Sequence, residues 1–337
     1  MSKSLNYIKG VGDKPLIILS TIFVLSISFI IALMLFSFII GVYIIFFTKE
    51  GILMSKNLIN TPYILIAGLP IPIPISITIG TLFTFSWIIY LIFFIIALKE
   101  PRNFIEVLKV IRKEGPKAIL DNTIFTVTSI FTILVITTLI IQYLQESSGI
   151  PTGSMPETEP ILMFVSISIA PLIEEIGFRL SLIGLLAAYL AFMAHKSTYS
   201  FYALWHPKNC LKKVIGNNLS KEMGILNIMI ILSSVFFGMA HITYGAGWGI
   251  GKVTQAALAG IALGWLYLHY GFPATVLLHW AFNYFTSAYH YFNKIVHIIY
   301  LTDLTSISII FTGMLGYLVI IILIIEKRLR LSTNQIS

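Results

Sequence analysis

The first long apolar segment of this chain, residues 16–47, contains no charged residue. At about 1.5 Å per residue, a helix of this length exceeds a hydrocarbon core of about 30 Å, so it must tilt, break or project into water. Only 11% of all residues are charged and 57% are hydrophobic, with a mean hydropathy of +0.92. Soluble domains carry about 25% charged residues. The sequence therefore predicts an integral membrane protein.

Further apolar segments follow, and together they predict an all-α polytopic membrane protein with about eight transmembrane helices. A single cysteine, Cys210, excludes an intramolecular disulfide framework and a thiolate metal cluster. The predicted spans are roughly 16–47, 77–98, 122–143, 160–180 (which could continue to 194), 223–243, 254–269, 272–290 and 305–325.

The basic residues are distributed unevenly between these spans. With the N-terminus in the cytoplasm, most of the 22 lysines and arginines fall on the cytoplasmic side, in the two tails and in the loops 99–117 and 196–221. The other side would carry Lys49, Lys56, Lys252 and Lys294. This asymmetry is the one that the positive-inside rule requires. We expect a multi-pass cell-membrane protein with both termini in the cytoplasm, a lipid bilayer as its partner and no nucleic acid.

A first polar motif lies inside the fourth span, in the stretch PLIEEIGFRL at residues 171–180. A charge at membrane depth costs about 2.5 kcal/mol or more. On a helix, Glu175 and Arg179 are four residues apart in the favourable order for an ion pair. Glu174 is rotated by about 100° from Glu175 and lacks a local partner. Glu174 is thus suited to act as a general base, although all three residues could instead be ion-pair contacts between helices.

Two further motifs place polar side chains on apolar helices. Phe237 and His241 are four residues apart near the end of the fifth span, and His279 and Asn283 have the same spacing in the seventh. Intramembrane polar pairs usually face a functional cavity. Around one cavity, a carboxylate could take a proton from water, one histidine could hold that water, and a histidine with an amide could stabilise an oxyanion. This is the chemistry of peptide hydrolysis.

Taken together, Glu174-Glu175-x-x-x-Arg179, Phe237-x-x-x-His241 and His279-x-x-x-Asn283 resemble the three ordered motifs of the CAAX-processing and bacteriocin-processing (CPBP) intramembrane proteases. This group includes the type II CAAX prenyl endopeptidases. The resemblance covers about 160–290.

The resemblance implies a role for each motif residue. Glu174 would be the general base, His241 would help to activate water, and His279 and Asn283 would form the oxyanion site. Glu175, Arg179 and Phe237 would support the site. The family implies catalysis on the cytoplasmic side without a metal or another cofactor, in a cavity between the fourth, fifth and seventh spans. The substrate would be a membrane-bound peptide or a lipidated, CAAX-type protein.

Helix lengths test this arrangement in part. Glu174 and His279 reach similar depths when each is measured along its own helix, nearer to the cytoplasmic side. His241 reaches that depth only if its helix begins well below the membrane, or if the glycine-rich segment 245–251 folds back.

We expect three regions: membrane spans and a basic loop at 1–159, a protease core at 160–290, and a last span with a basic tail at 291–337. Two alternatives remain open. A glutamate and two histidines could ligate zinc in a metal-dependent protease, although no HExxH motif is present. The chain could also be a non-catalytic scaffold, an immunity factor or a transporter component on the same fold.

Two local patterns predict backbone structure. Alternating prolines at 70, 72 and 74 forbid a regular helix and predict an extended segment before the second span. Ala256, Gly260 and Gly264 form a small-residue stripe that predicts close helix packing.

Overall fold

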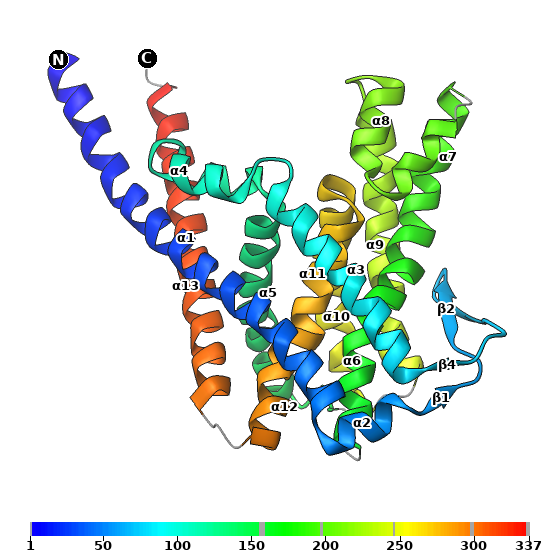
Figure 1. Cartoon of the computed structure of the whole chain (residues 1–337). Helices are drawn as coiled ribbons and strands as arrows, with labels where there is room; N and C mark the ends of the chain where they lie inside the picture. The colour runs from blue at the N-terminus through cyan, green and yellow to red at the C-terminus, as the bar shows by residue number, and fades with distance from the viewer. Residues whose placement is uncertain (1, 155–158, 196–197, 245–246, 297–299, 335–337) are drawn as a thin grey trace.

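A computed structural model describes residues 2–154, 159–195, 198–244, 247–296 and 300–334. The fold is all-α apart from two short β-ladders (Figure 1). The α-helices are α1 (Ser2–Phe47), α2 (Lys49–Ser55), α3 (Ile79–Lys99), α4 (Phe104–Glu114), α5 (Thr123–Ser147), α6 (Pro160–Glu175), α7 (Leu185–His195), α8 (Pro207–Ile215), α9 (Ser220–Thr243), α10 (Gly251–Tyr270), α11 (Phe272–Trp280), α12 (Thr286–Val296) and α13 (Tyr300–Asn334). Between them lie the 3₁₀ segments η1 (Gly115–Asp121) and η3 (Thr198–Leu204), and the π-helical segments η2 (Ile176–Gly184) and η4 (Ala281–Phe285).

Six helices in the described part of the chain are long and apolar enough to cross a membrane, which makes this a multi-pass membrane protein. They are Ile17–Phe47, Ile79–Lys99, Thr123–Ser147, Pro160–Ala194, Ser220–Thr243 and Tyr300–Ile325. The long first helix stays unbroken and crosses the bundle diagonally (Figure 1).

The other two predicted spans, 254–269 and 272–290, lie in α10 and in the continuous run α11–η4–α12. α10 is less apolar than the six helices above. The second run is interrupted by η4, and its first part, α11, is buried at every residue. A helix surrounded by protein needs less apolar surface than one that faces lipid. The count of eight spans stays a prediction.

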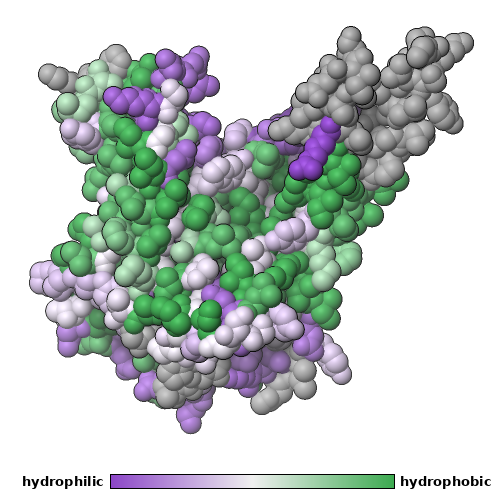
Figure 2. All heavy atoms as spheres, turned by 180° about the vertical axis from the view of Figure 1, so that it is seen from behind, coloured by the Kyte–Doolittle hydropathy of each residue, from purple (hydrophilic) through white to green (hydrophobic). Residues whose placement is uncertain are grey.

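The surface has the character expected of a protein in a bilayer. Seen from behind, its middle is mostly hydrophobic, and hydrophilic residues gather towards both ends (Figure 2). The start of α1, the end of α13, α4 and α8 all lie at one end of the molecule (Figure 1). The basic segments counted above therefore share one side.

The small-residue stripe of α10 packs as predicted. A Cβ atom on Gly260 would lie 2.9 Å from Cβ of Ser234, and one on Gly264 would lie 2.7 Å from Cγ2 of Ile230. Both neighbours belong to α9, so the two helices approach closely along this face.

An extended segment follows α2, as the alternating prolines predict. β1 (Leu58–Ile59) pairs with β4 (Ile77–Thr78), and β2 (Tyr63–Ile66) pairs with β3 (Leu69–Pro72), both in antiparallel fashion. Ala67 and Gly68 form the tip of the β2–β3 hairpin, with φ of 51° and 80°.

The hairpin tip is fixed to two helices. Gly68 N donates to the carbonyl of Gly177 at 3.2 Å, and Ala67 N donates to Oγ of Ser181 at 2.9 Å, both in η2. The Tyr244 hydroxyl, just after α9, donates to the Gly68 carbonyl at 2.6 Å. The hairpin therefore links η2 to the end of α9.

Candidate active site

Two helices lose their regular α form where they carry candidate site residues. Pro171 lies inside α6, and the π-helical segment η2 begins directly after Glu175. In the same way α11 ends one residue after His279, and η4 carries Asn283. Short π segments within α-helices occur frequently at functional sites, because the widened turn re-aims its side chains.

Glu175 lies at the centre of the polar cluster. Its Oε1 accepts hydrogen bonds from Nη1 of Arg179 at 3.1 Å and from Nδ1 of His279 at 2.7 Å. Its Oε2 accepts one from Oγ1 of Thr275 at 2.6 Å. The predicted Glu175–Arg179 pair is therefore present, and both side chains are 0% exposed. A buried carboxylate is stable only with such partners.

Thr275 is a member of this cluster that the sequence interpretation missed. It lies four residues before His279, and Asn283 lies four residues after it. The three polar residues therefore follow one line on an apolar helix, and extending the His279–Asn283 spacing by one step towards the N-terminus would have found Thr275.

Arg179 and Phe237 connect this cluster to α9 and α10. The guanidinium Nη2 of Arg179 donates to the carbonyl of Gly260 at 3.4 Å, and its Cζ lies 4.3 Å from the centre of the Phe237 ring. That ring lies 4.8 Å from the His241 ring and 5.6 Å from the His279 ring, nearly perpendicular to both. Phe237 thus packs between the two histidines.

Glu174 lies on the more open side of the same cluster. Its Oε2 is 3.6 Å from Nε2 of His279, and its side chain is 27% exposed, compared with 5% for His279. Nδ2 of Asn283 lies 3.3 Å from the same nitrogen. Because an ionised carboxylate only accepts hydrogen bonds, Nδ1 of His279 carries the proton that faces Glu175, and this bond fixes the ring so that Nε2 points to Glu174 and Asn283.

His241 reaches the cluster through Phe237 rather than through a hydrogen bond to another candidate residue in the described chain. Its Nδ1 donates to the backbone carbonyl of Phe237 at 2.9 Å, which leaves Nε2 able to accept. α9 begins at Ser220, three residues before the predicted span, and its last turn lies beside the site. Residues 245–246 of the glycine-rich segment lie outside the described residues.

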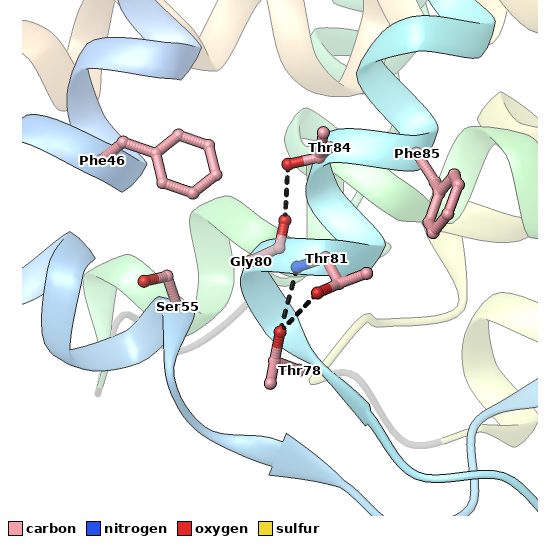
Figure 3. Close-up of a pocket in the computed structure, with 7 residues that line it drawn as sticks. All are labelled: Phe46, Ser55, Thr78, Gly80, Thr81, Thr84 and Phe85. Atoms are coloured by element: carbon pink, nitrogen blue, oxygen red, sulfur yellow. Dashed lines mark hydrogen bonds between the residues drawn. The ribbon is translucent and has the colours of Figure 1, made fainter.

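Other features of the described chain do not join this site. No three His, Cys, Asp or Glu side chains in those residues are grouped so that they could hold a metal ion. A cavity of about 360 Å³ lies between α1, α2 and α3, and no candidate residue lines it (Figure 3). Its threonine hydroxyls bond locally, as Thr84 Oγ1 donates to the Gly80 carbonyl and Thr78 contacts Thr81.

Comparison with known proteins gives one match. Residues 156–285 match the family model described as type II CAAX prenyl endopeptidase Rce1-like, over less than half of the chain. No curated protein and no solved structure matches the chain. All seven candidate residues, from Glu174 to Asn283, lie inside the matched segment. Over residues 156–285, the chain is thus similar to the Rce1-like type II CAAX prenyl endopeptidases, the group that its motifs resemble.

Proposed function

We propose that this protein is an intramembrane endopeptidase that hydrolyses a peptide bond near the C-terminus of a membrane-bound or lipidated, CAAX-type peptide. The observation that carries this proposal is the contact between partly exposed Glu174 and a histidine whose orientation is fixed by buried Glu175. The protease core would be 160–290, flanked by 1–159 and 291–337. The family match over 156–285 supports this assignment.

In the proposed reaction, Glu174 acts as the general base. A water molecule gives a proton to the Glu174 carboxylate while its oxygen bonds to the carbonyl carbon of the substrate. The C=O electron pair moves to the oxygen and forms a tetrahedral oxyanion. As the oxyanion collapses, the C–N bond breaks and the leaving amine takes the proton from Glu174, which returns to its carboxylate form.

His241, His279 and Asn283 assist at different atoms. The free Nε2 of His241 accepts a hydrogen bond from the attacking water. Asn283 Nδ2 and a protonated Nε2 of His279 donate to the oxyanion, and the buried carboxylate of Glu175, which accepts from Nδ1, stabilises that imidazolium. One such donor is worth about 3 kcal/mol in the transition state. Glu175, Arg179 and Phe237 position the histidines.

Both termini of the protein lie on the cytoplasmic side of the membrane. The shared position of the termini and the basic helices α4 and α8 supports this orientation (Figure 1). The lipid bilayer and the peptide are the expected partners, and the mechanism uses no cofactor.

The first test compares wild type with Glu174→Gln in proteoliposomes, with prenylated and unprenylated quenched-fluorescent peptides. Glutamine keeps the shape of the side chain but cannot take a proton, so cleavage should fall by about 100-fold or more. Glu106→Gln, at a side chain that is 62% exposed on α4, is the matched control and should cleave normally.

Each alternative predicts a different result. Cleavage by Glu174→Gln at the wild-type rate would exclude the glutamate mechanism. Loss of wild-type activity with a zinc chelator would favour a metal-dependent protease, with His241 and His279 as candidate ligands. A folded wild-type protein that cleaves no peptide in the panel would favour a non-catalytic scaffold, an immunity factor or a transporter component.

A further inference from the structure

A lysine and a tryptophan border the proposed active site but have no part in the mechanism above. Lys252 lies in the first turn of α10, and its ammonium is 4.0 Å from the centre of the Trp248 ring. Close packing of α9 on α10 places this turn beside the end of α9 that carries His241, since a Cβ atom on Gly238 would lie 2.6 Å from the Val253 carbonyl.

The backbone around the two residues is held firmly. Gly249 N donates to the Thr152 carbonyl and Gly251 N to the Pro151 carbonyl, both at 2.9 Å. Gln145 Nε2 donates to the carbonyl of Gly251 at 3.2 Å. Lys252 and Trp248 are therefore presented from a fixed position.

Lys252 lacks an acidic partner in the described chain. No carboxylate of the described residues lies within 4.0 Å of its ammonium, although its charge acts on Glu174 from a greater distance. Glu146, on the nearby end of α5, accepts hydrogen bonds from Thr152 and Gln142 instead. A cation in the first turn of a helix is also unfavourable for the helix dipole. Lys252 is half-buried and lies at the unfavourable end of the helix. Stabilisation of the fold therefore does not account for a lysine at this position.

Trp248 offers a second unused donor. Its indole Nε1 is buried and has no hydrogen-bond partner in the described residues. A buried donor without a partner costs free energy, unless a bound group supplies the acceptor. An ammonium over the ring and an unpaired N–H at its edge suit an acceptor with two oxygens and a negative charge.

We propose that Lys252 and Trp248 bind the free C-terminal carboxylate of the substrate peptide. This inference rests on the proposed peptidase function and adds a basis for specificity. Extended chain spans at most about 3.6 Å per residue, so a bond cut three residues from the C-terminus lies within about 11 Å of the carboxylate. The protein would then select peptides by the distance between the cut bond and a free C-terminus.

The test uses dye-labelled peptides prenylated at a cysteine four residues from the C-terminus, ending in either a carboxylate or a carboxamide. Binding and cleavage by the full-length protein in proteoliposomes are measured separately for wild type, Lys252→Gln, Lys252→Arg and Trp248→Phe. Wild type should prefer the carboxylate by about tenfold or more in Kd and in kcat/KM. Lys252→Gln should lose this preference through weaker binding of the carboxylate peptide alone.

The other variants separate the two contacts. Trp248→Phe keeps the ring face but removes the N–H, so part of the preference should disappear. Lys252→Arg keeps the charge and should retain most of it. Equal binding of both peptides by wild type, or an unchanged preference in Lys252→Gln, would overturn the proposal. A carboxylate preference in binding without any cleavage would support the carboxylate site while counting against the peptidase function.

Discussion

Two adjacent glutamates occupy different environments although they are neighbours in sequence. Glu175 is 0% exposed and holds three hydrogen-bond donors, whereas Glu174 is 27% exposed and faces a single histidine nitrogen at 3.6 Å. The rotation between consecutive helix residues separates them: one points into the packed cluster and the other to its open side. The two carboxylates therefore differ in exposure and in hydrogen-bond partners.

The Glu175–Arg179 pair should be essential for stability. Arg179→Met removes the cation but leaves the buried carboxylate, so the free energy of unfolding should fall by about 3–5 kcal/mol. The double variant Glu175→Gln/Arg179→Met should lose less unfolding free energy than Arg179→Met alone, because no unpaired buried charge remains. Unfolding in detergent micelles by added sodium dodecyl sulfate measures both.

Arg102 provides the control for that experiment. It pairs with Glu114 at 2.8 Å, but its side chain is 32% exposed. Arg102→Met should therefore lower the free energy of unfolding much less than Arg179→Met does, because water screens the exposed pair. If Arg102→Met and Arg179→Met lowered the free energy of unfolding equally, burial of the Arg179 pair would not add to its effect on stability.

The sequence predicted the Glu175–Arg179 pair by its spacing, since four residues make about one helical turn. It missed the Thr275 hydroxyl and the Lys252–Trp248 contact. Helical periodicity could have identified Thr275. The Lys252–Trp248 contact depends on a loop conformation and on the packing of α9 against α10, which no spacing in the sequence encodes.

Among the elements, the β2–β3 hairpin and η2 depend on each other. The Gly177 carbonyl, in the first turn of η2, accepts from Gly68 N at the hairpin tip. A Cβ atom at Gly177 would lie 2.4 Å from Cβ of Leu65, which is closer than such atoms can approach. The hairpin can rest against η2 only because residue 177 lacks a side chain.

Gly177→Ala should therefore displace the hairpin and lower both the thermal stability and the peptidase activity. Gly224→Ala is the matched control, because a Cβ at this position in α9 meets nothing within 4 Å. Alanine there should leave stability unchanged or raise it by up to about 1 kcal/mol. Thermal unfolding of both variants, together with cleavage of the same peptide, measures the difference. Similar behaviour of the two variants would show that the hairpin contact is dispensable.

The elements were only partly predictable from sequence. Alternating prolines indicated extended structure at 69–76, because proline is excluded from helix interiors. The pairing of β2 with β3 and its docking on η2 were not predicted, since they join residues far apart in the chain. The widened turns after Glu175 and Trp280 likewise depend on packing around the polar cluster.

For the whole molecule, the distribution of basic residues predicts the orientation in the membrane. Labelling of single cysteines with a membrane-impermeant maleimide in intact cells tests it. Cys210 is 0% exposed and can be replaced by serine to give a background without cysteine. In that background Asn57→Cys, after α2, should react from outside, and Asn217→Cys, after α8, should react only after lysis. The reverse pattern would invert the proposed topology.

The prolines of β3 have a consequence for contacts between separate molecules. Pro70 and Pro72 lie opposite Leu65 and Tyr63, and proline has no N–H to donate. The ladder bonds therefore come from Leu69 and Ile71, and the outer edge of β3 offers no amide donor at its two prolines. Leu69 and Ile71 are 63% and 44% exposed, an apolar strand of the kind that recruits further strands. By removing the edge donors, the sequence lets this strand stay exposed without seeding aggregation along β3.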